Sequence, residues 1–463
     1  MEHSRFLGLL TLIMLSACSP PNAVETNQVP IIKILAPKPG SPVTVGRAVP
    51  VLVSAADSDG SVSGVYLEVD EEQVATLEDA TGDGSYAGEF TPSLIGNQLL
   101  IAVASDDDGA QSRYVVNVVG LAAEELPVEE PPAQEPPNAI DSFTIIVIPD
   151  TQNMIAIPQN TMVDQMTHWI VSQAEALSIR FVTHVGDVVN DARDSDEWVR
   201  ADGALDRLDG VFPYSIAVGD HEYAREENMA SSTANYVSYF GPQRYSDYEW
   251  YGDSGPGGKN HYQFFDAGGR TFLHIALEWE APGPASDSAT PLGWARSIIE
   301  NHPELPTIIT THAYIWDQPG AEGRFPESEL EGFIEDSEGE RSYPGTSGAG
   351  IFDALVEPYP QVFMVLNGHY HKAPDGSTEE GEFHQVSENA AGLEVYEMLS
   401  DYQAYPNGGQ GYLRIIEFIP EGGDNGLDRI AVQTYSPVLD HFQTDARSQF
   451  HFDLSFEERW PWD

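Results

Sequence analysis

Short polar clusters recur along the chain from residue 149 onward, and each directly follows a run of β-branched and aliphatic residues. Carboxylate, imidazole and amide oxygen, the side-chain groups in these clusters, are ligands of divalent metals such as Mn, Fe, Zn or Ni. The chain has one cysteine, so no set of thiolates could shift the selection toward softer ions. The clusters occupy residues 149–152, 186–190, 219–222, 311–312 and 367–371.

The runs that precede the clusters predict strands, and the segment between the first two runs predicts a helix. Apolar residues at helical spacing lie within residues 161–177, which indicates a β-α-β unit and a mixed α/β core covered by helices. Ligands bind beyond the carboxyl ends of strands in such sheets, so the five clusters should converge on one site that holds two metal ions. The predicted strands are residues 143–148, 181–185, 214–218, 307–311 and 362–366.

Taken in order, the clusters resemble the signature of the calcineurin-like metallophosphoesterases. That signature reads Asp-x-His, Gly-Asp-x-x, Gly-Asn-His-Asp/Glu, a lone His and Gly-His-x-His, and the resemblance covers roughly residues 143–452. It implies a four-layer α/β/β/α metallophosphoesterase sandwich. It also implies metal-dependent hydrolysis of phosphate esters, as a phosphomonoesterase or a phosphodiesterase, by hydroxide that a dinuclear centre activates.

The resemblance assigns the first metal to Asp150 and His371, with Asp187 bridging to the second metal. Position 152 departs from the family pattern, because Gln152 stands where a histidine ligand is usual. Glutamine can still donate an oxygen to a hard metal. Asn190 stands where purple acid phosphatases carry a tyrosine ligand, so that ligand is missing.

The second metal is assigned by the same resemblance to Asp220, His312 and His369, together with the bridging aspartate. Asp220 replaces the usual asparagine, and its charge should tighten metal binding and raise the pKa of a bridging water. His221 matches the catalytic histidine of the family, which assists as an acid or stabilises charge on the phosphoryl group.

The two altered ligands, Gln152 and Asp220, also permit a different interpretation. In that alternative the domain is catalytically degenerate and serves as a metal-binding surface module for adhesion or assembly. The other ligands and His221 are all retained, which favours the enzyme.

The first 18 residues predict a lipoprotein signal peptide and lipobox. An apolar run at residues 6–17 is too short to span a bilayer, and it ends in Leu-Ser-Ala-Cys with Cys18 as the lipidation site. We therefore expect an exported protein at the cell envelope, held by its lipid anchor. Ser19, which follows the cysteine, favours the outer membrane if the source is Gram-negative.

Three further segments complete the predicted domain organisation. Residues 29–120 have short apolar runs between turn residues, which predicts an immunoglobulin-like β-sandwich. Its acidic turns at 56–62 and 105–109 could hold Ca²⁺ or be simple Asp-Gly turns. Residues 121–140 are a Pro/Glu-rich linker that should be extended, and residues 141–463 form the calcineurin-like metallophosphoesterase domain.

The charge of the chain limits its partners. Lys and Arg number 21 against 74 Asp and Glu, and the net charge of −53 should repel nucleic acid and anionic lipid. We therefore expect no nucleic acid as a stable partner, membrane contact through the lipid anchor only, and a phosphate ester as the substrate.

Two segments near the centre of the chain have less specific signals. The aromatic-rich residues 236–251 could wall a substrate pocket or pack on the core as a cap. The Gly-rich residues 252–258 lack the setting of a phosphate-binding loop and predict a flexible turn.

Overall fold

The protein is described from a computed structural model. The structure describes residues 27, 29–38, 41–57, 60–69, 72–78, 84–107, 109–121, 141–371 and 381–460. The predicted signal peptide with Cys18 and nearly all of the predicted linker lie outside the described residues. Within the described part of the chain, every helix is too short or too polar to cross a membrane.

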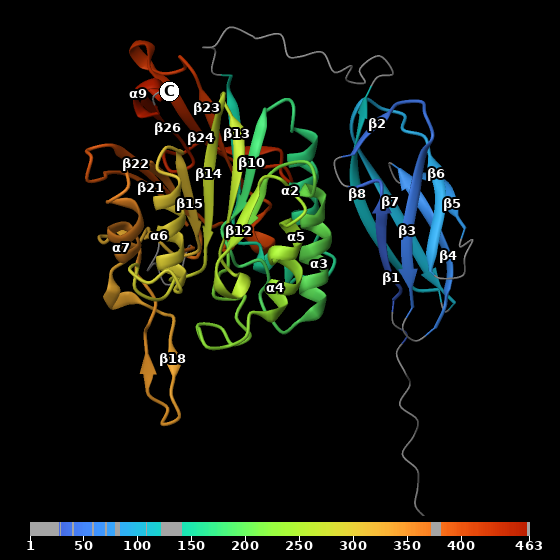
Figure 1. The fold of residues 1–463 in the computed structure, drawn as a ribbon, viewed down its shortest axis with the longest axis horizontal. Helices are drawn as coiled ribbons and strands as arrows, with labels where there is room; N and C mark the ends of the chain where they lie inside the picture. Colours follow the sequence, from blue (N-terminus) through green and yellow to red (C-terminus); the bar gives the residue numbers. More distant parts are fainter. Residues whose placement is uncertain are drawn as a thin grey trace, which may run out of the picture.

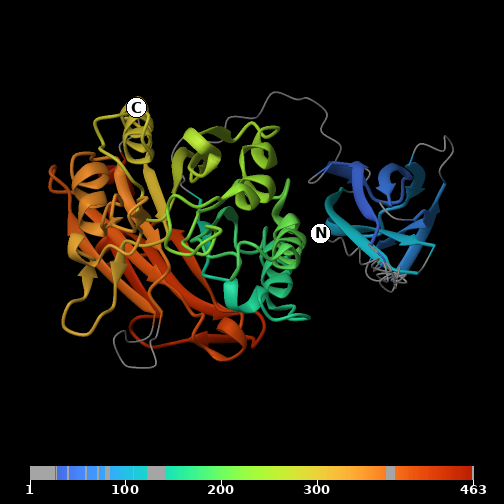
Figure 2. The ribbon, with the colours of Figure 1, turned by 90° about the horizontal axis from the view of Figure 1, so that it is seen from below.

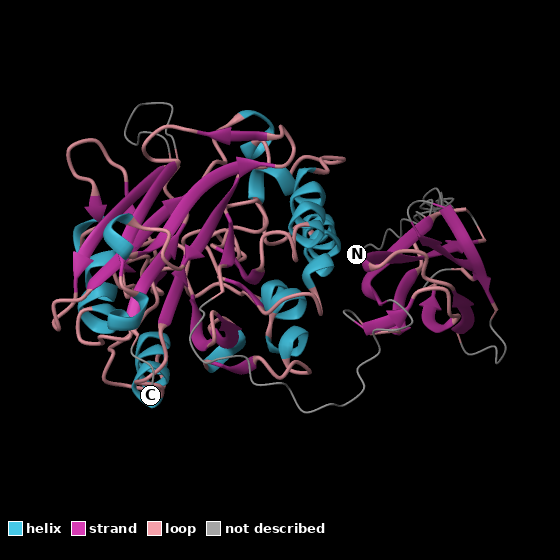
Figure 3. Cartoon of the chain, turned by 90° about the horizontal axis from the view of Figure 1, so that it is seen from above, coloured by secondary structure: helices cyan, strands magenta, loops and turns pink. Residues whose placement is uncertain are grey.

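The N-terminal unit is a β-sandwich of two sheets around its own core (Figure 2). Its described residues form strands and loops only (Figure 3). Inward and outward residues alternate along β3 (Val49–Ala56), where Val51, Val53 and Ala55 are buried, as expected for a strand with one face on the core. One sheet has the order β1-β3-β6, with β1 at Ile31–Ala36 and β6 at Ser85–Phe90.

The second sheet of this unit has the order β2-β8-β7-β4-β5. The short apolar runs of this unit, at residues 31–35, 49–55, 62–69, 99–104 and 113–119, all lie in strands, whereas β2, β5 and β6 are shorter or more polar and have no such run. The strands of this sheet are β2 (Ser41–Thr44), β8 (Gln111–Leu121), β7 (Gly96–Asp106), β4 (Val62–Val69) and β5 (Glu72–Leu77).

The C-terminal unit contains two large mixed sheets. The first has the order β11-β10-β9-β23-β24-β25, with β26 paired to β24, and β9, β10 and β11 run parallel. The C-terminal strands therefore return beside the first strand, since β23 pairs antiparallel with β9. The bounds are β9 Phe143–Ile148, β10 Ile179–His184, β11 Tyr214–Ile216, β23 Leu413–Ile419, β24 Asp428–Ser436, β25 His441–Gln443 and β26 Gln449–Leu454.

The second sheet has the order β12-β13-β14-β15-β20-β22-β21, and β14, β15, β20 and β22 run parallel. The bounds are β12 Tyr251–Ser254, β13 His261–Ala267, β14 Arg270–Leu277, β15 Thr307–Thr311, β20 Val362–Asn367, β21 Glu382–Glu388 and β22 Glu394–Ser400. Both sheets therefore contain parallel strands, at one side of the first sheet and at the centre of the second, as the β-α-β pattern predicts.

Successive side chains of the central strands point to opposite faces of the sheet, and this explains why one face packs on the other sheet and the other face on the helices. In β9, Ile145 packs in one core with Phe272 and Phe363 of the other sheet, whereas Ile146 belongs to a second core that the helices share. The helices α2 (Met162–Ser172) and α3 (Ser195–Leu205) lie on one side of the strands, and α6 (Pro291–Asn301) and α7 (Gly348–Ile351) lie on the other (Figure 1).

The aromatic-rich segment packs on the core as a cap. It forms α4 (Ala234–Phe240), α5 (Pro242–Tyr245) and the start of β12, and Tyr236, Phe240 and Tyr245 are completely buried. The Gly-rich segment is partly a strand, so the prediction of a flexible turn is wrong for its first residues. A side chain at Gly252 would meet the Tyr262 ring at 1.9 Å, so close packing of β12 on β13 explains this glycine.

Candidate metal centre

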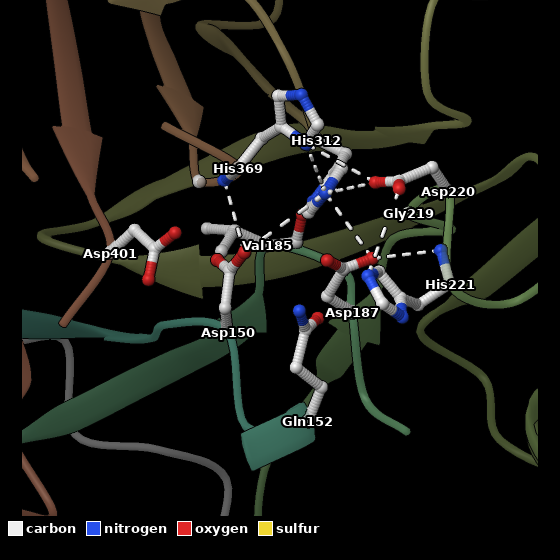
Figure 4. A network of polar contacts seen from close by, with 12 residues as sticks. Asp150, Gln152, Val185, Asp187, Gly219, Asp220, His221, His312, His369 and Asp401 are labelled. Carbon is white, nitrogen blue, oxygen red and sulfur yellow. Dashed lines mark hydrogen bonds and ion pairs between the residues drawn. The ribbon is translucent and has the colours of Figure 1, made fainter. Parts of the chain in front are cut away.

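The five predicted clusters meet at the carboxyl ends of parallel strands (Figure 4). The three loops after β9, β10 and β11 come from the first sheet, and the loops after β15 and β20 come from the second. They carry Asp150, Asp187, Asp220, His312 and His369, respectively. The clusters therefore converge as expected from the strand-end rule, by which ligands bind beyond the carboxyl ends of the strands in such sheets.

Glycines allow these loops to approach one another closely. A Cβ atom at Gly219 would lie 2.1 Å from Oδ1 of Asp187, and one at Gly368 would lie 2.0 Å from Oδ1 of Asp150. Gly186 has a φ of 107°, a backbone conformation that favours glycine. The glycines of the three motifs that contain one are thus required by the crowding of the ligand loops.

Four of the predicted ligands form one compact group. Nε2 of His312 lies 3.3 Å from Oδ1 of Asp187 and 3.1 Å from Oδ1 of Asp220, and Nδ1 of His369 lies 3.2 Å from the same Asp220 oxygen. One ligand atom from each residue lies within 4.8 Å of the others. This spacing suits side chains around one divalent ion with bonds of roughly 2.0–2.2 Å.

The outer nitrogen of each histidine in this group is held by a hydrogen-bond partner. Nδ1 of His312 lies 3.0 Å from the carbonyl of Val185, and Nε2 of His369 lies 2.8 Å from a carboxylate oxygen of Glu331. Partners of this kind orient a metal-binding imidazole and direct its other nitrogen to the ion. No motif in the sequence points to Glu331, which lies in a loop outside the five clusters.

Charge explains the ionisation of the group. Burial would lower the pKa of His312, but the carboxylates of Asp187 and Asp150 raise it well above its usual value. Burial would raise the pKa of Asp220, but His369 and His312 hold it well below its usual value. Buried charges of this density persist only with partners of opposite charge, which suits a cation site.

The predicted ligands of the first metal have oxygen atoms available. Asp150 and Gln152 are buried, and Oδ1 of Asp150 and Oε1 of Gln152 accept no hydrogen bond from the described residues. A buried polar atom without a partner costs about 1–3 kcal/mol. Both residues therefore fit a divalent metal, and the other oxygen of Asp150 accepts the amide of His369 at 3.0 Å.

His371 lies beside two residues that sequence reasoning did not single out. Its Nδ1 is 3.1 Å from Nε2 of Gln403 and 3.7 Å from Oδ2 of Asp401, and its side chain is 41% exposed. Asp401 directly follows β22, another parallel strand. Applying the strand-end rule to residues 394–400 would have identified it.

His221 lies next to the group with one nitrogen fixed. Its backbone amide donates to Oδ1 of Asp187, and its Nδ1 lies 2.7 Å from the carbonyl of Asn190, so Nε2 is directed outward. Burial lowers its pKa, but Asp187 and Asp220 outweigh that effect and raise the pKa to about 9. A cavity of about 320 Å³ is lined by His221 with residues 190–193 and 223–226.

Glu222, the last residue of its motif, connects two ligand loops. Its buried carboxylate accepts the backbone amides of Asp187 at 2.9 Å, Val188 at 2.8 Å and Gly219 at 2.7 Å. Burial and the nearby Asp187 raise its pKa to about 7, which these amide hydrogen bonds oppose. Its role is to hold the loops that carry the ligands.

The aspartates of the acidic turns in the N-terminal unit accept backbone hydrogen bonds. Asp106 accepts the amide of Ala110 at 2.7 Å, and Asp107 accepts the amide of Ser61 at 2.7 Å. Among the described residues of this unit, no group of three or more His, Cys, Asp or Glu side chains is close enough to hold one metal ion. The first bond is local to its turn, the second joins the two acidic turns, and residues 58, 59 and 108 are outside the described ranges.

Comparisons with known proteins identify the N-terminal unit. Residues 30–98 match the family model described as a bacterial Ig domain, so this unit is an immunoglobulin-like β-sandwich. Uncharacterized protein YvnB of Bacillus subtilis (strain 168) is 29% identical over 328 residues, which cover 69% of this chain and 22% of that protein. The chain therefore spans about a fifth of the length of this relative.

Two solved structures have partial likenesses to the chain. Purple acid phosphatase PPD1 from yellow lupin seeds matches 94% of this chain and 76% of its own, at 11% identity and a TM-score of 0.43. The fibronectin(III)-like modules of Clostridium thermocellum CbhA match 22% of this chain and 52% of their own, at 26% identity and a TM-score of 0.20.

Proposed function

We propose that residues 141–463 form a calcineurin-like metallophosphoesterase domain, a four-layer α/β/β/α sandwich that hydrolyses phosphate esters with two divalent metal ions. The observation that carries this proposal is the convergence of Asp187, Asp220, His312 and His369 from four strands onto one group of ligand atoms. The unpaired oxygens of Asp150 and Gln152 support a second ion beside it.

The reaction needs charge neutralisation and proton transfer. A bound pair of divalent ions would neutralise the phosphoryl oxygens and lower the pKa of a water for in-line attack. Asp187, whose carboxylate lies beside His312 and the His221 amide, would help to hold both ions. The Val185 carbonyl and Glu331 orient the imidazoles of His312 and His369, and Glu222 holds the ligand loops.

His221 supplies the proton in this proposal. Its Nδ1 is engaged by the Asn190 carbonyl, so the outward Nε2 is the nitrogen that can carry a proton toward the cavity. The cavity next to it has room for the leaving group of an ester, and Arg193 and Arg225 line its wall. His221 therefore donates to the leaving oxygen as the bond to phosphorus breaks.

A second candidate is a degenerate metal-binding module that serves in adhesion or assembly. Gln152 and Asp220, the two departures from the family pattern, are the observations that favour it. The retained position of His221 and the fixed outer nitrogens of His312 and His369 favour catalysis instead.

Assays on metal-loaded protein separate the two candidates. The purified protein is stripped with a chelator, reloaded with Mn²⁺ and assayed on p-nitrophenyl phosphate and bis(p-nitrophenyl) phosphate. We expect Mn²⁺-dependent hydrolysis that Asp187→Asn abolishes. The matched control is Asp196→Asn, an exposed aspartate on α3, which should keep full activity. Stoichiometric metal binding without hydrolysis of either ester would favour the degenerate module.

We further propose that Cys18 anchors the protein to the cell envelope through lipid, in the outer membrane of a Gram-negative source. The net charge of −53 supports membrane contact through the anchor alone and argues against nucleic acid as a partner. Globomycin, or Cys18→Ala, should block processing to the lipidated form. Release of an unmodified soluble protein from untreated wild-type cells would contradict this.

A further inference from the structure

A sixth strand-end residue, Asp401, lies at the metal centre. Across the first sheet, the loops after β11, β10 and β9 carry Asp220, Asp187 and Asp150 in that spatial order. Across the second sheet, the matching positions after β15, β20 and β22 carry His312, His369 and Asp401, respectively. Figure 4 shows Asp220 at one end of this array and Asp150 with Asp401 at the other. The end near Asp401 is where the first metal is expected.

The surroundings of Asp401 suit a metal ligand. Its side chain is completely buried, and Figure 4 shows its carboxylate directed toward Asp150. Its two oxygens accept the backbone amide of Gln403 at 2.9 Å and the Gln403 side-chain amide at 3.0 Å. Each carboxylate oxygen has two acceptor positions, so one remains on each. Two buried carboxylates that face each other are stabilised by a cation between them.

Gln403 fixes the orientation of Gln152. Its Oε1 accepts a hydrogen bond from Nε2 of Gln152 at 2.9 Å and another from Nδ2 of Asn153 at 2.8 Å. The nitrogen of the Gln152 amide is therefore engaged with Gln403, while Oε1 of Gln152 has no partner among the described residues. This arrangement leaves the oxygen, which is the metal-binding atom of the amide, for a cation.

We propose that Asp401 is a ligand of the first metal and replaces the imidazole that is lost where Gln152 stands, and that Gln403 positions the Gln152 oxygen. This inference rests on the dinuclear centre of the proposed function. The first site then has oxygen ligands from Asp150, Gln152, Asp187 and Asp401 beside the one imidazole of His371, whereas the second has two imidazoles. An oxygen-rich site prefers a hard cation such as Mn²⁺ or Mg²⁺ over Zn²⁺.

The test measures metal binding to the full chain. Chelator-treated protein is titrated with Mn²⁺ by calorimetry, and bound metal is counted by elemental analysis after gel filtration. Wild type should bind two ions. Asp401→Asn should keep one ion with unchanged affinity and bind the other at least about 10-fold more weakly, the lower end of the loss expected when a metal site is disturbed.

Four further variants locate the effect. Glu397→Gln, a buried carboxylate on β22 that pairs with Arg324, is the matched control and should bind both ions as wild type does. Gln403→Leu should weaken only the first site. The double variant Asp401→Asn with Gln403→Leu should bind the first ion more weakly than Gln403→Leu alone. The reason is that Asp401, as a ligand, binds the metal directly and not only through its hydrogen bonds with Gln403. Gln152→His should restore first-site binding in the Asp401→Asn background and raise its preference for Zn²⁺.

The outcomes separate this inference from the proposed function. If wild type and Asp401→Asn both bind two ions with equal affinity, Asp401 is not a ligand, although the dinuclear enzyme stands. If Asp401→Asn has no effect once Gln403 is replaced by Leu, Asp401 acts only through Gln403 and the ligand assignment is wrong. Fewer than two ions in wild type would overturn the inference and the dinuclear centre together.

Discussion

His221 and Asp187 are in hydrogen-bond contact but have different chemical surroundings, so their variants should differ. Asp187 lies among the ligand atoms, whereas Nε2 of His221 is directed away toward the cavity. Asp187→Asn should lose both metal and turnover. His221→Ala should keep its metals and lose about 10²–10⁴-fold in turnover, as expected for general acid assistance.

Metal analysis beside kinetics on nitrophenyl and alkyl esters checks this prediction. The alkyl ester should suffer the larger loss in His221→Ala, because its leaving oxygen needs a proton more. If His221→Ala loses metal, His221 is a ligand. If it hydrolyses the alkyl ester at the wild-type rate, the acid is another residue.

At the scale of elements, a buried ion pair joins the two sheets. Nη2 of Arg414 on β23 lies 2.8 Å from Oε1 of Glu382 on β21, and both side chains are buried. Glu382→Ala leaves the guanidinium buried without its partner, which should lower the free energy of unfolding by about 3–5 kcal/mol. Denaturant unfolding measures the loss.

The control for this pair is Glu388→Ala, at the exposed end of the same strand, which should cost less than about 0.5 kcal/mol. The double variant Glu382→Met with Arg414→Met should be more stable than Glu382→Ala, since neither charge remains buried. Equal losses in the double variant and Glu382→Ala would show that the cost is packing and not charge.

Buried histidines on two neighbouring strands make folding sensitive to acid. His261 on β13 is completely buried, and burial lowers its pKa from 6.5 to about 4. The unfolded chain then binds a proton that the folded chain excludes, so stability is full above pH 6.5 and falls as pH drops toward 4. This residue alone should remove about 2 kcal/mol between pH 7 and pH 5.

Denaturant unfolding of metal-free protein at pH 7 and pH 5 tests this prediction. His261→Gln should reduce the pH dependence by about that amount, whereas His168→Gln, on the exposed face of α2, should leave it unchanged. An identical pH dependence in wild type and His261→Gln would mean that His261 is protonated in the folded protein.

At the scale of the whole molecule, the metal centre draws all its residues from the C-terminal unit. The N-terminal unit has its own core of residues from β1, β3, β4, β7 and β8, among others. A chain that begins at Pro137 should therefore fold and keep metal-dependent hydrolysis. Circular dichroism and the nitrophenyl ester assay check this. A folded but inactive shortened chain would show that the N-terminal unit contributes to the site.

The sequence alone determined the local features of this protein. The strands that end at residues 148, 311 and 366 or 367 were predictable because runs of β-branched residues bounded by polar clusters have few alternatives. The four residues that gather at the second site, Asp187, Asp220, His312 and His369, were identified before any geometry. Their motifs carry this information because backbone crowding requires the glycines at fixed spacing from the ligands.

Only the tertiary structure decided which residues from outside the motifs join the site. Glu331 and Gln403 have no local signal, because their neighbours in sequence resemble ordinary loops, and the only signal for Asp401 is its place directly after the strand at residues 394–400. Asp401 and Gln403 reach Asp150 and Gln152 through the pairing of β22 with β20 and the packing of the two sheets, and Glu331 reaches His369 from its own loop. Such long-range contacts depend on side-chain packing between strands far apart in the chain, which periodicity and spacing do not encode.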